Sequence, residues 1–295
     1  MRDVIIAGAG PAGSRCAAQL AAQGYDVLVL EAAAEPTGKP VCTGLISYRC
    51  ARDYGIETAV IRPAGSARLY SPSGRSLHIS REEPQACVID RAVLQVELSR
   101  KAAAAGADYR YGCRVTNIVT ESDRVRVTCE QDGVSTHEEA RAAVIACGYA
   151  PGLTADVGLG SPSRFAVGAQ AVITTDAVTE VEVYTGSLSP GFFGWIVPAE
   201  AGLARAGLLA RHDAAGRLRQ WLEALAISGR ITSSDVTVNT GAVPLAPLPR
   251  TFSTQLIAVG DAAGQVKPTS GGGIYYGLLG ADAAAATLHE ALANN

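Results

Sequence analysis

Two glycine-rich segments, one near each end of the chain, have the residue types and spacing that bind a phosphate-bearing ligand. The first is Gly8-Ala9-Gly10-Pro11-Ala12-Gly13, directly after the apolar run Val4–Ala7. Its glycines stand where a pyrophosphate needs a tight turn, a close approach and close helix packing. Glu31 ends the next apolar run, 18 residues after Gly13, and its carboxylate can accept hydrogen bonds from ribose hydroxyls. We therefore expect a dinucleotide site here.

The second segment runs from Gly260-Asp261-Ala262-Ala263-Gly264 to Lys267-Pro268-Thr269-Ser270-Gly271-Gly272-Gly273-Ile274. It follows a strand-like run, Leu256–Val259, and precedes an Ala-rich helix predicted from about Gly277 to Ala293. Glycine lets the backbone approach a ligand closely, and a helix start offers free N–H groups and a positive dipole end. The structural alternative is that Asp261 only caps a helix. Two such segments suggest one cofactor around which the whole chain folds.

The elements that must position the first segment alternate between strand and helix. They are expected at Asp3–Ala7, Pro11–Gln23, Asp26–Leu30, Asp90–Ala105 and Asp108–Tyr111. Three runs of alternating polarity then indicate a β-meander, at Arg114–Thr120, Arg124–Glu130 and Ser135–Ala140. Ala143–Ala146 returns to the parallel sheet.

The pattern changes after residue 160, where long alternating strands surround one helix, Ala214–Ile227. This is typical of an antiparallel sheet with a covering helix. The predicted fold class is α/β: a discontinuous Rossmann-like cofactor domain with a β-meander insertion, residues 1–160 and 255–295, and an α+β substrate domain with an antiparallel sheet, residues 161–254.

Composition excludes several classes of protein. Apolar residues make up 48% and charged residues 18% of the chain, which is typical of a folded enzyme. The net charge of −3 gives no reason to expect a nucleic-acid partner. The seven Cys lack CxxC spacing and the four His lack metal-ligand spacing, so we expect a reducing, cytoplasmic setting and no metal. A monomer is the expectation, and peripheral membrane contact stays open.

Three further stretches make the chain resemble the geranylgeranyl reductase family, within the FAD-dependent, aromatic hydroxylase-like flavoproteins. Gly38-Lys39-Pro40-Val41-Cys42-Thr43-Gly44 resembles the cysteine-bearing loop of that family, and Gly191–Pro198 resembles its aromatic segment. Lys267–Ile274 is similar to its triple-glycine loop. Cys147-Gly148 stands where the superfamily usually has Asp-Gly, which argues against a tight nicotinamide contact. The external reductant is expected to be NAD(P)H or another electron carrier.

The resemblance implies FAD as cofactor and an isoprenoid or isoprenoid lipid as substrate. The implied FAD-binding residues are Gly8, Gly10, Pro11, Ala12, Gly13, Glu31, Lys39, Cys42, Gly44, Arg91, Arg114, Val115, Gly148, Gly260, Asp261, Gly264, Gly271, Gly272, Gly273 and Ile274. Cys42 and Tyr276 are the candidate catalytic residues, as proton donors. The substrate would contact Phe192, Phe193, Trp195 and Pro198.

The implied activity is reduction of geranylgeranyl-type carbon–carbon double bonds by hydride from reduced flavin. One alternative is an FAD-dependent aromatic monooxygenase on the same scaffold. Another is a flavin-binding relative without turnover, which the short region after the last predicted helix would favour. For Cys42 and for the aromatic segment, ordinary core packing is the competing interpretation.

Overall fold

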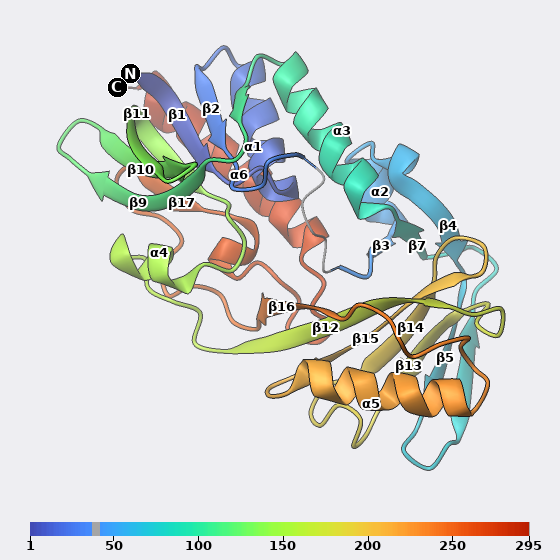
Figure 1. Ribbon diagram of the computed structural model, residues 1–295. Coiled ribbons are helices and arrows are strands. Elements are labelled where there is room, and N and C mark those ends of the chain that lie inside the picture. Colours follow the sequence, from blue (N-terminus) through green and yellow to red (C-terminus); the bar gives the residue numbers. More distant parts are fainter. Residues whose placement is uncertain (37–41, 295) are drawn as a thin grey trace. The chain divides into compact units, whose positions relative to one another are not determined.

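The computed structural model describes residues 1–36 and 42–294. The chain divides into two compact units (Figure 1). Unit 1 comprises Met1–Lys39, Ala92–Arg164 and Pro244–Asn295, and unit 2 comprises Pro40–Arg91 and Phe165–Val243. No helix among the described residues combines the length and apolar character needed to cross a membrane.

Unit 1 is built on a seven-stranded sheet with strand order β8-β2-β1-β11-β10-β9, to which β17 adds beside β11. Its strands are β1 (Arg2–Ala7), β2 (Val27–Leu30), β8 (Asp108–Arg110), β9 (Arg114–Thr120), β10 (Val125–Gln131), β11 (Val134–Ile145) and β17 (Leu256–Ala258). Strands β8, β2, β1 and β17 run parallel to their neighbours, and β9, β10 and β11 form the expected antiparallel meander. The α/β class and the meander insertion are thereby confirmed.

Strand β11 is one continuous strand, where the sequence predicts two at Ser135–Ala140 and Ala143–Ala146. Its first half pairs antiparallel with β10, and its second half pairs parallel with both β1 and β17. Arg141 lies between the two predicted strands. In the structure its Nη1 donates to the Asp3 carboxylate (3.1 Å) and its Nη2 to the Leu292 carbonyl (2.8 Å), so the strand continues through it.

Helices of unit 1 cover the sheet. They are α1 (Pro11–Ala22), α3 (Arg91–Ala104, in unit 1 from Ala92 on), α4 (Pro151–Asp156), α6 (Ile274–Ala293) and the short 3₁₀ helix η2 (Gly260–Ala263). Helices α1 and α6 pack together through small and branched side chains, including Ala17, Leu20, Ala284 and Leu288. Because α6 begins at Ile274 rather than near Gly277, the triple-glycine loop leads directly into the helix.

Unit 2 contains a seven-stranded sheet of order β16-β12-β15-β14-β13-β5-β6 and a three-stranded sheet of order β3-β7-β4. The large sheet is formed by β5 (Ser66–Tyr70), β6 (Ser76–Ser80), β12 (Phe165–Thr174), β13 (Val181–Tyr184), β14 (Gly194–Pro198), β15 (Leu203–Ala210) and β16 (Asn239–Pro244). The small sheet and the helices are β3 (Leu45–Ser47), β4 (Val60–Ala64), β7 (Ala86–Ile89), α2 (Tyr48–Asp53), α5 (Ala214–Ile227) and the 3₁₀ turn η1 (Glu57–Ala59).

The sequence placed residues 40–91 in the cofactor domain, but in the structure they group with unit 2. The reason is a strand pairing that local sequence patterns do not predict. Strand β5 joins the large sheet parallel to β13, with Ala67 opposite Val181 and Tyr70 opposite Tyr184. Val88 of β7 also packs in one cluster with Val181 and Val197. The antiparallel layer expected of residues 161–254 is therefore completed by an earlier part of the chain.

The two faces of the large sheet differ in character. One face packs on α5, through residues such as Ala171, Ala206 and Ile196 against Leu218 and Leu222. Because side chains alternate along a strand, the residues between these point to the other face. There, adjacent strands place Gln170 opposite Gly207 and Gly207 opposite Trp195, while Arg205 lies two positions before Gly207. We call this second face, marked by Gln170, Arg205, Gly207 and Trp195, the polar face.

Candidate functional site

The first glycine segment forms the turn from β1 to α1, and its three glycines have different reasons to be glycine. Gly8 has φ +106°, and a Cβ there would lie 2.5 Å from the Ala146 carbonyl oxygen. A Cβ on Gly13 would collide with the Gly8 carbonyl oxygen. At Gly10, by contrast, the nearest atom to a Cβ is the Ala146 oxygen at 3.9 Å. The chain itself leaves room at Gly10, so this glycine fits the close approach of a ligand.

The N-terminus of α1 is suited to an anion. Gly10 is the N-cap residue and offers no side-chain cap, and Pro11 occupies the first turn. The helix's first hydrogen bond runs from the Ser14 amide to the Gly10 carbonyl (2.9 Å). The amides of Ala12 and Gly13 precede that bond and point out of the helix start, where the dipole is positive. The residues expected to bind a pyrophosphate therefore form a suitable cradle.

Glu31, expected to accept ribose hydrogen bonds, also ties the glycine turn to the end of β2. Its Oε2 accepts from the Ala9 amide at 2.7 Å and its Oε1 from the Ala33 amide at 2.8 Å. A carboxylate oxygen can accept more than one hydrogen bond, so ribose hydroxyls remain compatible with these contacts. Glu31 therefore stabilises the glycine turn, in addition to its predicted role of binding the ribose hydroxyls.

Buried polar side chains also support this turn, and no sequence motif predicts them. The Ala9 carbonyl accepts from Ser14 Oγ at 2.9 Å and from the Gln95 side-chain amide of α3. Ser14 Oγ in turn accepts from the Tyr109 hydroxyl at 3.0 Å. The peptide at Ala9 is therefore held through its N–H and through its carbonyl, which fixes the turn that leads to Gly10. A Ser inside an alanine-rich helix face was the only available signal.

Two of the expected FAD-binding residues, Arg114 and Val115, directly follow a residue that is hydrogen-bonded to Glu31. The Cys113 amide donates to the Glu31 carbonyl at 2.8 Å, and Arg114 and Val115 follow as the first residues of β9. Gly148, with φ +75°, comes shortly after β11, at the same carboxyl edge of the sheet as the glycine turn. These residues are therefore gathered at one edge, as the resemblance implies.

The second glycine segment lies against the first. Gly260 has φ +66°, and a Cβ there would come 3.0 Å from the Ala12 Cβ of α1. Gln265 Oε1 accepts from the Gly260 amide at 2.7 Å and holds this corner. Gly264, with φ +70°, closes the turn, where a Cβ would collide with the Ala246 carbonyl. Two segments about 250 residues apart in sequence thus adjoin within unit 1.

Asp261 and the triple-glycine loop meet at the start of α6. A Cβ on Gly273 would lie 2.8 Å from Asp261 Oδ1, so only glycine admits the carboxylate there. Gly273 is the N-cap of α6 and provides no side-chain cap. The loop is closed by the Gly271 amide donating to the Lys267 carbonyl (2.9 Å) and by the Lys267 amide donating to the Gly272 carbonyl (3.1 Å). A second helix start with available N–H groups results, beginning at Ile274.

Tyr276, a candidate proton donor, lies in the first turn of α6 and is 42% exposed. Its ring makes an edge contact with Tyr275, with centroids 6.0 Å apart. The Tyr276 hydroxyl group therefore belongs to the first turn of α6, which directly follows the triple-glycine loop.

Arg91, the first residue of α3, provides the clearest test of fit for an anionic cofactor. Its Nε and Nη1 are buried and have no hydrogen-bond partner among the described residues. Leaving a buried donor unpaired costs about 1–3 kcal/mol, and more for a charged group. A phosphate or ribityl oxygen would satisfy these two donors. The residues present therefore fit FAD, as the resemblance implies.

Cys42 belongs to unit 2 and is half-buried, while Lys39 lies outside the described residues. The Cys42 sulfur accepts from the Gly44 amide at 3.4 Å. Gly44 has φ +74°, and a Cβ there would lie 2.5 Å from both Arg205 Nη1 and the Ile89 carbonyl oxygen. The segment 42–44, called the Cys42 loop below, is thus closely fitted to its surroundings.

The predicted substrate residues lie on and beside β14. The indole of Trp195 rests over Gly207, where a Cβ would come 2.5 Å from the ring atom Cζ2. Phe193 packs beside it, with ring centroids 5.8 Å apart. Trp195 Nε1 is buried and lacks a partner in the described part of the chain. Phe192 is half-buried and Pro198 is buried at the end of the strand. The aromatic wall is therefore formed by Trp195 and Phe193.

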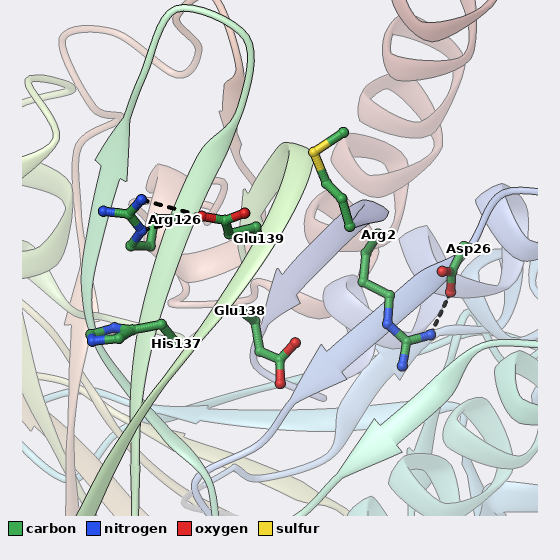
Figure 2. Close-up of a pocket in the computed structure, with 7 residues that line it drawn as sticks. Arg2, Asp26, Arg126, His137, Glu138 and Glu139 are labelled. Atoms are coloured by element: carbon green, nitrogen blue, oxygen red, sulfur yellow. Dashed lines mark hydrogen bonds and ion pairs between the residues drawn. The ribbon is translucent and has the colours of Figure 1, made fainter.

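An open hollow of about 560 Å³ lies elsewhere in unit 1 (Figure 2). It surrounds the start of β1 at Met1 and Arg2, the end opposite to Gly8. Its charges are paired with each other: Arg2 with Asp26 at 2.5 Å and Arg126 with Glu139 at 3.2 Å. We find no group of metal-ligating side chains in the described ranges. This hollow is a solvated charged surface, distinct from the glycine cradle.

Comparisons with known proteins show which families the chain is similar to. Residues 2–183 match the pyridine nucleotide-disulphide oxidoreductase family. The chain is 30% identical to digeranylgeranylglycerophospholipid reductase 2 of Methanopyrus kandleri, over 94% of this chain and 74% of that protein. It is also 30% identical to geranylgeranyl diphosphate reductase of Rhodobacter capsulatus, over 94% of this chain and 72% of the other. The crystal structure of a geranylgeranyl bacteriochlorophyll reductase-like protein from Thermoplasma acidophilum shares the fold, with a TM-score of 0.90, 23% identity, and coverage of 100% and 79% of the two chains.

Proposed function

Since the chain belongs to the pyridine nucleotide-disulphide oxidoreductase family and to the geranylgeranyl reductases, we propose that it is an FAD-dependent oxidoreductase that reduces isoprenoid carbon–carbon double bonds. The observation that carries the cofactor assignment is the meeting of the two glycine segments in unit 1, where Gly260 adjoins Ala12. Two helix starts without side-chain caps, at Gly10 and Gly273, then serve one anionic ligand.

Different residues of this cradle would bind different parts of the cofactor. The amides of Ala12 and Gly13 would bind the pyrophosphate, and Glu31 would accept from the adenosine ribose. Asp261 would accept from the ribityl chain, and the amides after Gly273 would stabilise negative charge on the flavin ring. Arg91 would pair its two unsatisfied donors with an oxygen of the same cofactor.

The substrate proposal rests on the aromatic wall of unit 2. Trp195 and Phe193 present apolar surface, and each methylene buried from water contributes about 0.8 kcal/mol. A long isoprenoid chain gains most from such a surface, whereas a small phenol gains little. The relatives from Methanopyrus and Rhodobacter are named for reduction of lipid-borne or diphosphate-borne geranylgeranyl groups. We therefore propose an isoprenoid or isoprenoid lipid as substrate.

When bound and reduced, FAD supplies the hydride for the double bond. The chain's own residues have three tasks: to hold the alkene still, to exclude water, and to deliver a proton to the second carbon. Trp195 and Phe193 serve the first two tasks. The Cys42 thiol and the Tyr276 hydroxyl are the proposed proton donors, since each can release a proton and be reprotonated from solvent.

Anaerobic turnover tests the proposal. Purified protein should carry about one FAD per chain, and after chemical reduction it should convert geranylgeranyl diphosphate to products heavier by two hydrogens per bond reduced, as read by mass spectrometry. Oxygen uptake with small phenols, and no alkene reduction, would instead indicate a monooxygenase. Bound FAD without turnover of either kind would indicate a flavin-binding relative.

We also propose that the protein acts as a cytoplasmic monomer that contacts membranes peripherally when its substrate is a lipid. Vesicle flotation with and without an archaeal-type isoprenoid lipid tests the contact, and light scattering tests the monomer. Flotation that does not depend on the lipid, or a dimer at working concentration, would contradict this part.

A further inference from the structure

A buried carboxamide on the polar face of the large sheet uses both its oxygen and its nitrogen in hydrogen bonds to the Cys42 loop. Gln170, on β12, is 7% exposed. Its Nε2 donates to the Cys42 carbonyl at 3.3 Å, and its Oε1 accepts from Thr43 Oγ1 at 3.0 Å. Burying an amide side chain costs free energy unless its hydrogen bonds are replaced, and here the loop replaces them. The carboxamide and the loop are therefore matched to each other.

A guanidinium group on the neighbouring strand holds the same loop. Arg205 Nη1 donates to the Thr43 carbonyl at 2.6 Å and to the Ile89 carbonyl at 3.0 Å. Burial lowers the pKa of Arg205, while the nearby carboxylates of Asp90 and Glu200 act in the opposite direction. The missing Cβ at Gly44 is what lets the guanidinium lie this close to the loop.

Gln170 and Arg205 share their sheet face with the aromatic wall. Gln170 is opposite Gly207 across one strand pair, and Gly207 is opposite Trp195 across the next. Since the Trp195 ring rests on Gly207, one face of unit 2 carries the aromatic wall and the anchor of the Cys42 loop side by side. A hydrophobic residue at position 170 would pack on such a face equally well, so a polar residue there needs a specific reason.

We propose that Gln170 and Arg205 are positioning residues that set the place of the Cys42 thiol for alkene reduction, an inference that rests on the proposed function. Gln170 fixes the backbone at Cys42 through the carbonyl and the next residue through its hydroxyl. Arg205 fixes the peptide that follows. The thiol then has one orientation relative to the Trp195 wall, on the same face of the sheet.

The main test replaces Gln170 with the similarly shaped Met, which removes both hydrogen bonds. We expect kcat for alkene reduction to fall by about tenfold, as for the loss of one or two hydrogen bonds, with KM and FAD content unchanged. A merely structural role would lower the melting temperature and leave kcat per folded enzyme as it was. An unchanged kcat in folded Gln170→Met would overturn the proposal.

Thr43 provides a matched pair if Gln170→Met fails to fold. Thr43→Val removes the hydroxyl that donates to Gln170 at almost constant volume, whereas Thr43→Ser keeps it. We expect Val to lower kcat and Ser to restore most of it. Equal activities for the two variants would contradict the proposal.

A thiol-labelling assay separates this inference from the proposed function, because it needs no alkene turnover. Cys147 is the exposed thiol among those described, and the others apart from Cys42 are buried, so a Cys147→Ser background leaves Cys42 to react with iodoacetamide. Gln170→Met should change the labelling rate and its pH dependence relative to that background. If the wild-type enzyme reduces no alkene but Gln170→Met still changes the labelling of Cys42, the proposed function is wrong. The placement of the Cys42 thiol by Gln170 is then supported on its own. If the pH dependence of labelling is the same in Gln170→Met as in the background, the positioning role is contradicted and the proposed function is not affected.

Discussion

Single residues in the glycine cradle differ in what they contribute, although the sequence motif treats them alike. Gly8 and Gly13 are required by contacts inside unit 1, whereas Gly10 faces room that the chain does not fill. Glu31 anchors the turn through two backbone amides while keeping lone pairs for a ligand. A substitution at Gly10 therefore separates cofactor binding from folding.

We predict that Gly10→Val weakens FAD binding by more than tenfold, because branched carbons occupy the path of the pyrophosphate. The melting temperature of the cofactor-free protein should stay close to that of the wild type. Fluorescence titration with FAD measures the affinity. Gly152→Ala, on α4 with nothing within 4 Å of the added Cβ, is the matched control and should bind FAD normally. Normal FAD affinity in Gly10→Val would place the pyrophosphate elsewhere.

A second prediction contrasts two cysteines. Cys42→Ala should reduce alkene turnover at unchanged FAD content, because the thiol takes part in the reaction and hardly in cofactor affinity. Cys16 is fully buried on α1, and burial raises the pKa of its thiol to about 12, so it stays a neutral packing group. Cys16→Ser should therefore lower stability by about 1–3 kcal/mol and spare turnover per folded enzyme. Denaturant unfolding and anaerobic assays distinguish the two. Full activity in Cys42→Ala would return Cys42 to a packing role.

At the scale of elements, the parts that local patterns control were predictable, and the parts that depend on distant pairing were not. The first strand, helix and second strand follow from periodicity and from the glycines that end them. The continuity of β11 through Arg141 depends on Asp3 and Leu292, which lie far away in sequence.

The candidate site shows the same division. Motif residues such as Gly10, Glu31 and Asp261 could be picked out because their spacing is characteristic. Gln170 and Arg205 could not, because an isolated polar residue in a strand has no local signal of what it will touch. The parallel pairing of β5 with β13, which moves residues 40–91 into unit 2, was hidden for the same reason.

The approach of α6 to the cradle yields a prediction at this scale. A Cβ on Gly277 would lie 3.3 Å from the Gly260 Cα and 3.6 Å from the Ala12 Cβ. Gly277→Val should push the helix start away, at a cost of about 1–3 kcal/mol, and weaken FAD binding as well. Ala286→Val, at an exposed position of the same helix, should do neither. Unfolding midpoints and FAD titration provide the two measurements. Wild-type stability in Gly277→Val would show that α6 is not held by this contact.

For the whole molecule, cofactor binding and stability should be linked. A ligand that binds only the folded state stabilises it by about 2.7 kcal/mol at a free concentration one hundred times Kd. We therefore expect the melting temperature to rise steadily with added FAD in the wild type, and hardly at all in Gly10→Val. Differential scanning fluorimetry of the cofactor-free protein is the measurement. A melting temperature indifferent to FAD in the wild type would argue against the glycine cradle as its site.

The pairing of β11 with both β1 and β17 has a consequence for how the protein folds during synthesis on the ribosome. Its second half pairs with β1, which is translated before it, and with β17 at Leu256–Ala258, which is translated long after it. Both segments of unit 2 are translated before β17. Until β17 has been translated, one edge of β11 therefore stays unpaired, and such an edge can pair with other chains. Nascent chains halted before residue 256 should recruit chaperones, whereas released chains that contain β17 should not need them.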